Sequence, residues 1–154
     1  MYDRMLLAPD IRVTEELFEN SERFARILYG VNQESFDKLL FAKSYLTSTF
    51  RAEWIDIGAP RYCCKSGEYN FKVYTNVECN GDIDRFLTLK DPIIYEEFQW
   101  WWVGKACVYL RYKSGLPMRE FLNYITVEEL LDMYHLGHEV NLDYIWNKLC
   151  VRFK

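Results

Sequence analysis

Residues 91–113 read DPIIYEEFQWWWVGKACVYLRYK, and this stretch predicts one helix that is apolar on nearly every side. Asp91 is a favourable N-cap, and Pro92 stands at the first helical position, where a missing N–H costs nothing. The three adjacent tryptophans at 100–102 spread over roughly 200° of a helix, so they cannot share one face. A helix that is apolar all round is buried, or buried on one side and docked to a partner on the other. We therefore predict that this helix is central to the fold.

The N-terminal third of the chain predicts a helical hairpin. Thr14 can cap a helix that runs to Tyr29 and is stopped by Gly30, because glycine readily adopts the left-handed conformation of a helix end. Asn32 can cap a second helix that continues to about Phe50. The apolar side chains of both segments recur at helical spacing, which predicts that each buries one face.

Residues 53–80 predict a small antiparallel β-sheet. Short aromatic or β-branched runs are broken here by turn residues, and Phe71, Val73 and Thr75 alternate with other side chains at the period of a half-buried strand. The expected fold class is therefore α+β. It is a single, mostly helical domain over residues 1–154, with the sheet packed on about five or six helices.

The C-terminal part predicts a pair of helices. Thr126 and Glu129 have the spacing of a capping box, and the helix that they begin should end at Gly137. Asn141 can cap a last helix with a clean apolar stripe. A further short helix is expected at residues 82–90, ahead of the tryptophan-rich one.

The composition limits the classes of function. The net charge is −4, and even residues 61–115, the most basic part, carry eight basic and seven acidic side chains. Proteins that bind phosphate backbones normally cluster Lys and Arg, so direct binding of nucleic acid is not expected. No apolar run is long enough for a signal peptide or a membrane span, and the cysteine count of five is odd. We expect a cytoplasmic protein with reduced thiols and no membrane partner.

A metal site is only a weak alternative. The two histidines, His135 and His138, are three residues apart, and Cys63 and Cys64 could add thiolates. However, Gly137 interrupts the helix between the histidines, and adjacent cysteines in a strand point to opposite faces. No surrounding motif marks a catalytic cysteine, and the glycines form no phosphate-binding loop. We therefore expect no cofactor and no catalytic residue, with a small Cys/His enzyme or zinc protein as the second alternative.

A nucleic-acid-binding regulator is the first alternative. The helices expected at residues 126–136 and 141–152 have the outline of a helix-turn-helix. A recognition helix should present Arg, Lys, Asn or Gln to the bases. Here the second helix offers Asp143, Asn147 and Lys148, and the turn is at the long end of the usual range. An antiparallel helix pair that closes the core explains the same pattern.

The preferred hypothesis is a protein-binding module that is not an enzyme. Aromatic residues make up 18% of the chain, and Tyr and Trp concentrate energy at interfaces. One specific form is an inhibitor encoded by a phage or mobile element that docks on a host defence protein, by analogy with anti-CRISPR proteins. A homodimer is also left open.

We expect such a surface to use aromatic side chains beside acidic ones. The candidate partner-binding residues near the predicted sheet are Tyr62, Tyr69, Tyr74 and Asp82. The tryptophan-rich helix supplies the other candidate, Trp100, because three adjacent tryptophans are hard to bury completely in a chain of this size.

Overall fold

The structure, a computed structural model, is an assembly of helices and describes residues 2, 4–63, 65–88 and 94–154. Within those ranges there is no strand, and Phe36 and Leu87 form an isolated antiparallel bridge. The α-helices are α1 (Arg4–Tyr29), α2 (Lys38–Leu46), α3 (Pro60–Cys63), α4 (Gly67–Val77), α5 (Glu97–Ser114), α6 (Met118–Phe121), α7 (Val127–Gly137) and α8 (Leu142–Leu149). The other helical turns are η1 (Gln33–Ser35), η2 (Arg51–Ile55), η3 (Asp84–Phe86) and η4 (Cys150–Phe153).

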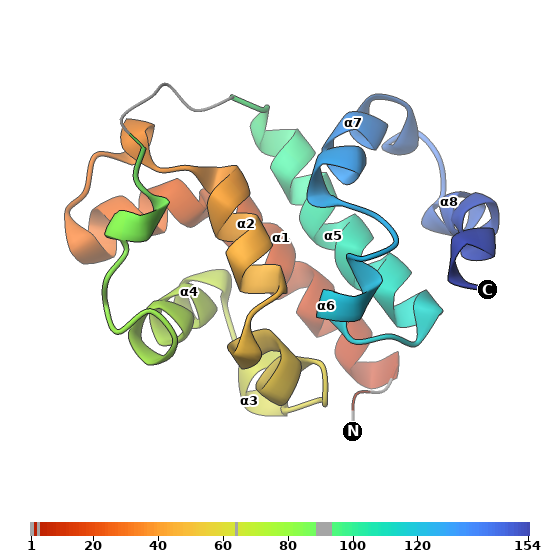
Figure 1. The fold of residues 1–154 in the computed structure, drawn as a ribbon, viewed down its shortest axis with the longest axis horizontal. Coiled ribbons are helices and arrows are strands. Elements are labelled where there is room, and N and C mark those ends of the chain that lie inside the picture. The colour runs from red at the N-terminus through yellow and green to blue at the C-terminus, as the bar shows by residue number, and fades with distance from the viewer. Residues whose placement is uncertain (1, 3, 64, 89–93) are drawn as a thin grey trace.

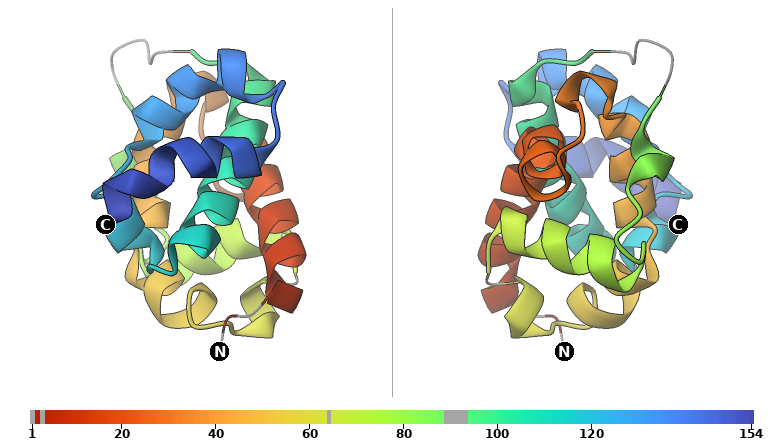
Figure 2. Two further views of the ribbon diagram at one scale, coloured as in Figure 1. Left: turned by 90° about the vertical axis from the view of Figure 1, so that its right-hand side faces the viewer. Right: turned by 90° about the vertical axis from the view of Figure 1, so that its left-hand side faces the viewer.

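Helices α1 and α5 form the centre of the fold. They run antiparallel, since Phe18 of α1 meets Trp100 of α5 while Tyr2, just before α1, meets Tyr112. Figure 1 shows this pair across the middle of the molecule, with α2, α3 and α4 on the left and α6, α7 and α8 on the right. The side views show α8 crossing α5 and α4 crossing α1 (Figure 2).

Glycines make the two closest helix crossings possible. A Cβ atom at Gly104 of α5 would lie 2.8 Å from the carbonyl oxygen of Thr14, and one at Gly67 of α4 would lie 2.6 Å from the backbone nitrogen of Leu17. Both distances are shorter than van der Waals contact, so a larger residue would push the helices apart. Helix α1 therefore packs main chain to main chain against both of its largest neighbours.

The prediction of a central tryptophan-rich helix is confirmed. Helix α5 starts with a capping box between Glu96 and Gln99, whereas the predicted cap at Asp91 and Pro92 lies outside the described residues. Trp100 and Trp102 are buried, while Trp101 keeps 37% of its surface exposed. The three rings do point in different directions, as the helical geometry requires.

The predicted antiparallel sheet at residues 53–80 is wrong, and so is the α+β fold class. Most of that segment forms α3 and α4, and the side chain of Ser66 caps α4 by accepting a hydrogen bond from the backbone N–H of Tyr69. The buried residues Phe71, Tyr74 and Thr75 follow the helical spacing, so Tyr74 is buried in the core and Val73 is only partly buried at its edge. The sequence of residues 71–76 is compatible with the period of a helix and with that of a strand. Packing against α1 selects the helix.

Several helix ends differ from the predicted ones. Helix α1 begins ten residues before Thr14, which is buried in its middle. The expected helix from Asn32 to Phe50 is divided: Asn32 caps only η1, and Asp37 caps α2. The short helix expected at 82–90 is the 3₁₀ turn η3, with residues 89 and 90 outside the described part.

The C-terminal helix pair agrees with the sequence. Thr126 and Glu129 form the predicted capping box, and the side chain of Asn141 caps α8. Helix α7 also ends at Gly137, but a Cβ there would lie 2.9 Å from the Trp102 ring. That glycine therefore makes room for a tryptophan, which its place at the helix end did not indicate.

The buried apolar side chains form one cluster that is rich in aromatic rings. Phe41 lies at its centre, 5.2 Å from the ring of Phe71 and 5.3 Å from that of Phe86. Tilted and edge-to-face contacts of this kind are the favourable geometries for aromatic pairs. Among the described residues, no helix combines the length and the apolar character that a membrane span requires.

Replacement of Trp102 with Ala should lower the free energy of unfolding by about 3–5 kcal/mol, because it empties a buried site beside Gly137. Urea unfolding measures this. Trp101→Ala is the matched control in the same helix, and its loss should be clearly smaller because Trp101 is 37% exposed. Equal losses for the two variants would contradict the packing described for α5.

Candidate functional site

The aromatic residues proposed near residues 53–80 do not form an exposed acidic patch. Tyr74 is buried against Tyr45, with the ring centroids 5.3 Å apart, and Tyr62 packs edge-on to Phe50 at 5.2 Å. Tyr69 is half-buried, 6.4 Å from the Tyr62 ring.

The charged neighbours of this aromatic pair are basic. The guanidinium of Arg61 lies 5.7 Å from the Tyr62 ring centroid, and Arg61 Nε donates a hydrogen bond to the Tyr69 hydroxyl. Lys65 lies 5.9 Å from the Tyr69 ring. Asp82 is exposed and follows the far end of α4, whose last residue, Val77, lies roughly 12 Å along the helix axis from Tyr69. The Asp82 carboxylate accepts a hydrogen bond from the backbone N–H of Asp84, in the turn that begins η3.

Trp100, the candidate on the tryptophan-rich helix, is buried inside the α1–α5 pairing. Its ring meets Phe18 edge-on at 6.2 Å and Tyr95 at 5.8 Å, and the ammonium of Lys38 lies 5.5 Å from its centroid. A partner would have to displace these groups to reach Trp100. The side chain next to it, Trp101, is the one that reaches solvent.

The two histidines of the weak metal alternative lie at the surface near the end of α7. His135 and His138 are exposed, and the His138 ring stacks on Tyr134 with its Nδ1 2.6 Å from the Tyr134 carbonyl oxygen. The side chain of Cys63 and all of Cys64 lie outside the described part of the chain. Among the residues described, no three His, Cys, Asp or Glu side chains are placed to hold a metal ion.

The helix-turn-helix alternative concerns α7 and α8. Lys148 lies over the Tyr144 ring at 4.7 Å, and Arg152, just beyond α8, pairs with Glu129 of α7 at 2.8 Å. Asp143 accepts a hydrogen bond from Tyr109 of α5. These contacts tie α8 to α5 and α7, which is the arrangement of an antiparallel pair that closes the core.

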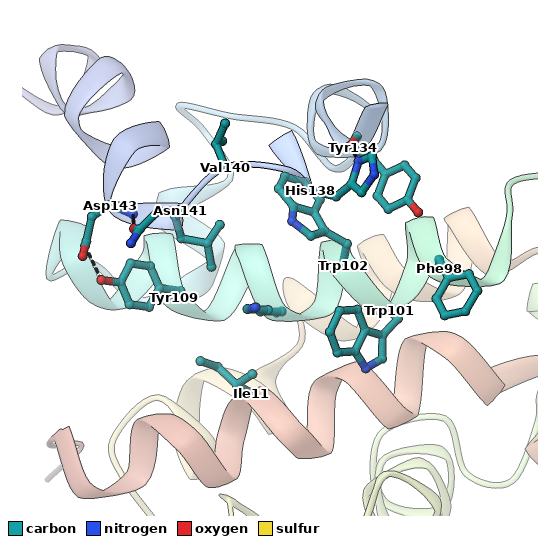
Figure 3. Close-up of a pocket in the computed structure, with 12 residues that line it drawn as sticks. Ile11, Phe98, Trp101, Trp102, Tyr109, Tyr134, His138, Val140, Asn141 and Asp143 are labelled. Atoms are coloured by element: carbon teal, nitrogen blue, oxygen red, sulfur yellow. Dashed lines mark hydrogen bonds between the residues drawn. The ribbon is translucent and has the colours of Figure 1, made fainter. Parts of the chain in front are cut away.

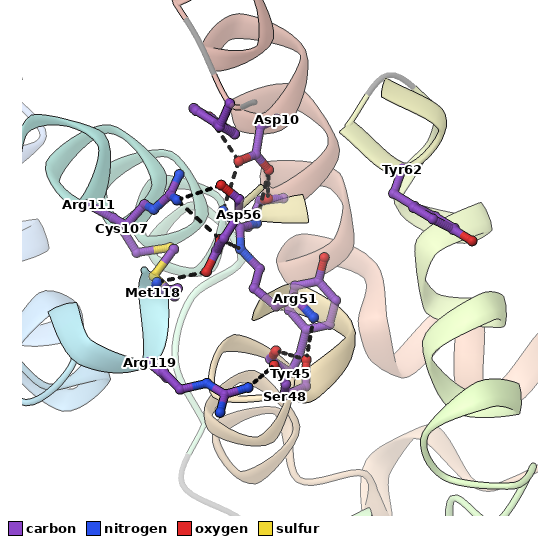
Figure 4. Close-up of polar contacts among 12 residues, drawn as sticks. Asp10, Tyr45, Ser48, Arg51, Asp56, Tyr62, Cys107, Arg111, Met118 and Arg119 are labelled. Atoms are coloured by element: carbon purple, nitrogen blue, oxygen red, sulfur yellow. Dashed lines mark hydrogen bonds and ion pairs between the residues drawn. The ribbon is translucent and has the colours of Figure 1, made fainter. Parts of the chain in front are cut away.

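The first candidate site is a cluster of buried charged side chains (Figure 4). Arg51, fully buried in the π-helical turn η2, donates to both carboxylate oxygens of Asp10 at 3.0 and 2.8 Å and to Asp56 at 2.9 Å. Arg111 of α5 lies 3.7 Å from the Asp56 carboxylate, and the backbone N–H of Met118 donates to it at 2.8 Å. Two cations meet two anions here, so the charges balance.

We call the four charged side chains of this cluster, Asp10, Arg51, Asp56 and Arg111, the clasp, because their contacts hold separate segments together. Burial lowers the pKa of the Arg51 guanidinium, but Asp10 and Asp56 outweigh that effect and hold the pKa well above its ordinary value. The charges of Asp10, Arg51 and Asp56 are paired with protein groups from α1, η2, α5 and α6. The cluster joins α1, η2 and the neighbouring helices α5 and α6, which come from three distant parts of the sequence.

The second place is an open groove of about 610 Å³ between α1, α5 and the α7–α8 turn (Figure 3). Helix α5 forms its floor, and Ile11 of α1 points toward it from one side. The opposite wall comes from the end of α7, with Tyr134 and His138, and from Val140 and Asn141 before α8.

Helix α5 places five side chains in this groove. Positions 98, 101, 102, 105 and 109 fall within roughly 100° of the helix circumference, so they share one face. Phe98 is 67% exposed and Trp101 is 37% exposed, so two large aromatic side chains one turn apart are open to solvent on the groove floor. The twelve lining residues are Ile11, Phe98, Trp101, Trp102, Lys105, Tyr109, Tyr134, His138, Val140, Asn141, Leu142 and Asp143.

Charges flank the aromatic side chains. The Lys105 ammonium lies 5.6 Å from the Trp101 ring centroid. Burial raises the pKa of Glu15 on α1 to about 7, an effect that Lys105 opposes and Glu19 reinforces. At the other end, Asp143 accepts a hydrogen bond from Tyr109 and lies 3.8 Å from Lys113. The groove can therefore accept an apolar segment together with a charge.

Sequence reasoning missed Phe98, Trp101 and Ile11 as groove residues. The spacing of Phe98, Trp101, Lys105 and Tyr109 at three or four residues was a visible signal that they share a face. What the sequence lacked was the direction of that face, because α5 is apolar all round. Comparison with protein-family models, with curated proteins and with solved structures found no match for this chain.

Replacement of Arg51 with Met should lower the free energy of unfolding by about 3–5 kcal/mol, because buried Asp10 loses its cation and Asp56 keeps only the more distant Arg111. Arg119→Met is the matched control, since Arg119 is exposed and only reaches the Ser48 carbonyl at 3.4 Å. Its cost should stay within about 0.5 kcal/mol. If Arg51→Met unfolds at the wild-type urea concentration, the clasp does not stabilise the fold.

Replacement of Glu15 with Gln should stabilise the protein at pH 8 and have little effect at pH 5. The pKa of Glu15 is about 7 in the folded protein and ordinarily near 4.5, so the folded state binds the proton more tightly. Stability from this group therefore falls as the pH rises between those values. Melting temperatures at the two pH values measure it, with exposed Glu53→Gln as control. A gain of equal size at both pH values would contradict the assignment to Glu15 ionisation.

Proposed function

We propose that this protein is a binding module that docks on another protein through the groove between α1, α5 and the α7–α8 turn. The observation that carries the proposal is the exposure of Phe98 and Trp101 along the floor of that groove. Large aromatic side chains held open to solvent cost free energy that a partner can recover by covering them. Aromatic anchors on a rigid element are typical of the centre of an interface.

The packing that holds helix α5, the floor of the groove, in place favours binding of a partner. Helix α5 is held from behind by α1 at the Gly104 crossing and from the side by Trp102 against Gly137. The exposed rings are therefore carried by a helix that cannot shift easily, so little conformational entropy is lost when a partner orders them. Interfaces of this kind gain affinity from anchors that are already in place.

The lining of the groove gives less support to catalysis. Its twelve described residues include no cysteine or serine that could act as a nucleophile. His138 uses Nδ1 at the Tyr134 carbonyl, and Asp143 already accepts from Tyr109. An inhibitor of a host defence protein needs a docking surface but no catalytic site. The hypothesis that this protein is such an inhibitor stays a prediction.

The test is affinity capture from the cells that make the protein, followed by binding measurements with the purified partner. Trp101→Ala should weaken binding to that partner by about 2 kcal/mol or more, as expected for a central anchor. Trp54→Ala is the matched control, because Trp54 is a tryptophan that is 44% exposed but lies on η2, away from the groove. Its affinity should equal that of the wild type.

Melting temperatures of both variants establish that neither has lost its fold. A partner that binds wild type and Trp101→Ala equally well, or that is lost only with Trp54→Ala, would refute this groove as the docking site. Duplex DNA binding that falls steeply with salt, in the absence of any protein partner, would instead favour the nucleic-acid alternative.

A further inference from the structure

We infer that the occupant of the groove is a basic amphipathic helix of the partner protein, which places a Lys or Arg side chain over Trp101 and beside Glu15. This inference rests on the proposed function and specifies the chemistry of the partner. It follows from the position of one lysine, from the balance of charge at one end of the groove, and from the length of the groove floor.

The chain itself shows how a cation fits on Trp101. The Lys105 ammonium lies 5.6 Å from the Trp101 ring centroid, within the range of a cation–π contact. Glu15 lies beside Lys105 at the α1–α5 crossing, since its Cα would be 3.0 Å from a Cβ at Gly104, and the Lys105 charge partly offsets the rise in the pKa of Glu15 that burial causes. The Trp101 ring and the Glu15 carboxylate thus both attract the Lys105 ammonium. A cation of the partner would bind next to Lys105, against the same ring and carboxylate.

The charge at this end of the groove is not balanced by Lys105 alone. Ile11 lines the groove, and Glu15 and Glu19 follow it at one-turn intervals along α1. Glu97 precedes Phe98 at the start of α5 and is exposed. Glu19 and Glu97 also lie near Lys38 of α2, so four carboxylates (Glu15, Glu19, Glu22 and Glu97) share the two ammonium groups of Lys38 and Lys105, and the excess of negative charge attracts a basic partner.

The nearby cation of α2 does not remove this excess. Lys38 pairs with Glu22 at 2.9 Å and also donates to the carbonyl oxygen of Glu19. Its single charge is shared among Glu22, Glu97 and Glu19, so it cannot balance all of them. At the opposite end of the groove, Asp143 and Lys113 lie 3.8 Å apart and offset each other. The cation of the partner is therefore expected at the Phe98–Trp101 end.

The shape of the groove favours a helix as its occupant. From Phe98 to Tyr109 the floor measures about 16 Å along α5, which equals three turns of a second helix. An amphipathic helix laid between two walls buries its apolar stripe while its basic residues reach the rim. Phe98, Trp101 and Ile11 would contact the stripe, and Glu15 and Glu19 would meet the charges.

A pair of synthetic peptides tests the inference directly. One is a helix-forming peptide of about 18 residues made of Leu and Lys in an amphipathic pattern, and the other replaces every Lys with Glu. Fluorescence anisotropy measures the affinity of each labelled peptide for the full-length protein. The Leu–Lys peptide should bind at least about tenfold more tightly than the Leu–Glu peptide, and added salt should reduce the difference.

Three variants then locate the site. Glu15→Gln should weaken binding of the Leu–Lys peptide about threefold, and Lys105→Gln should tighten it by a similar factor because a competing cation is removed. Trp101→Ala should weaken it at least about tenfold. Trp54→Ala should leave the affinity unchanged, and melting temperatures establish that every variant is folded.

The opposite results overturn the inference. Tighter binding of the Leu–Glu peptide, weaker binding after Lys105→Gln, or no binding of the Leu–Lys peptide would each exclude a basic helix as the occupant. Self-association that is abolished by Trp101→Ala would make a second copy of this chain the occupant instead. The proposed function would survive the failure of the Leu–Lys peptide if a captured partner still depends on Trp101, and it fails separately if that partner does not.

Discussion

The close crossing of α1 and α5 at Gly104 is the constraint on which the rest of the structure depends. The missing side chain brings the backbones of the two longest helices together, and the same stretch of α1 meets α4 at Gly67. Once α5 is fixed in this position, the place of each residue around the helix decides which way its side chain points. Trp100 turns into the core beside Phe18, Trp102 turns toward α7, and Trp101 is left at the edge. The groove thus exists because a helix that is apolar on nearly every side is covered on only part of its circumference.

The clasp of buried ions and the groove place opposite demands on charge. In the clasp, Arg51 is held by Asp10 and Asp56 without solvent, and its charges balance within the fold. At the groove, Glu15 stays near the surface with its pKa raised toward neutrality, and Lys105 offsets only part of the negative charge around it. Charge that is already paired fixes segments in place, whereas charge that is only partly offset is available to another molecule.

The sequence predicted those parts of the fold that depend on local signals. The capping box at Thr126 and Glu129, the cap at Asn141 and the helical nature of α5 all arise within a few residues of one another. The segment that forms α4 could not be resolved in this way, because Phe71, Tyr74 and Thr75 fit a helix while Phe71, Val73 and Thr75 fit a strand. Contact with α1 at Gly67, more than forty residues away in the sequence, decides between the two periods. The groove was harder still, since its location depends on which face of α5 its neighbours leave uncovered.

The clasp also has a consequence for how relatives of this chain should diverge. Aromatic and aliphatic core residues can replace one another at modest cost when the total volume is kept, so the many rings of this core can drift. Asp10, Arg51, Asp56 and Arg111 cannot change one at a time, because each single loss leaves a charge buried without its partner. Distant relatives are therefore expected to keep these four positions as a set or to exchange them together for apolar residues. Acidic, basic, acidic and basic residues at positions equivalent to 10, 51, 56 and 111 would indicate common descent even where overall sequence identity is low.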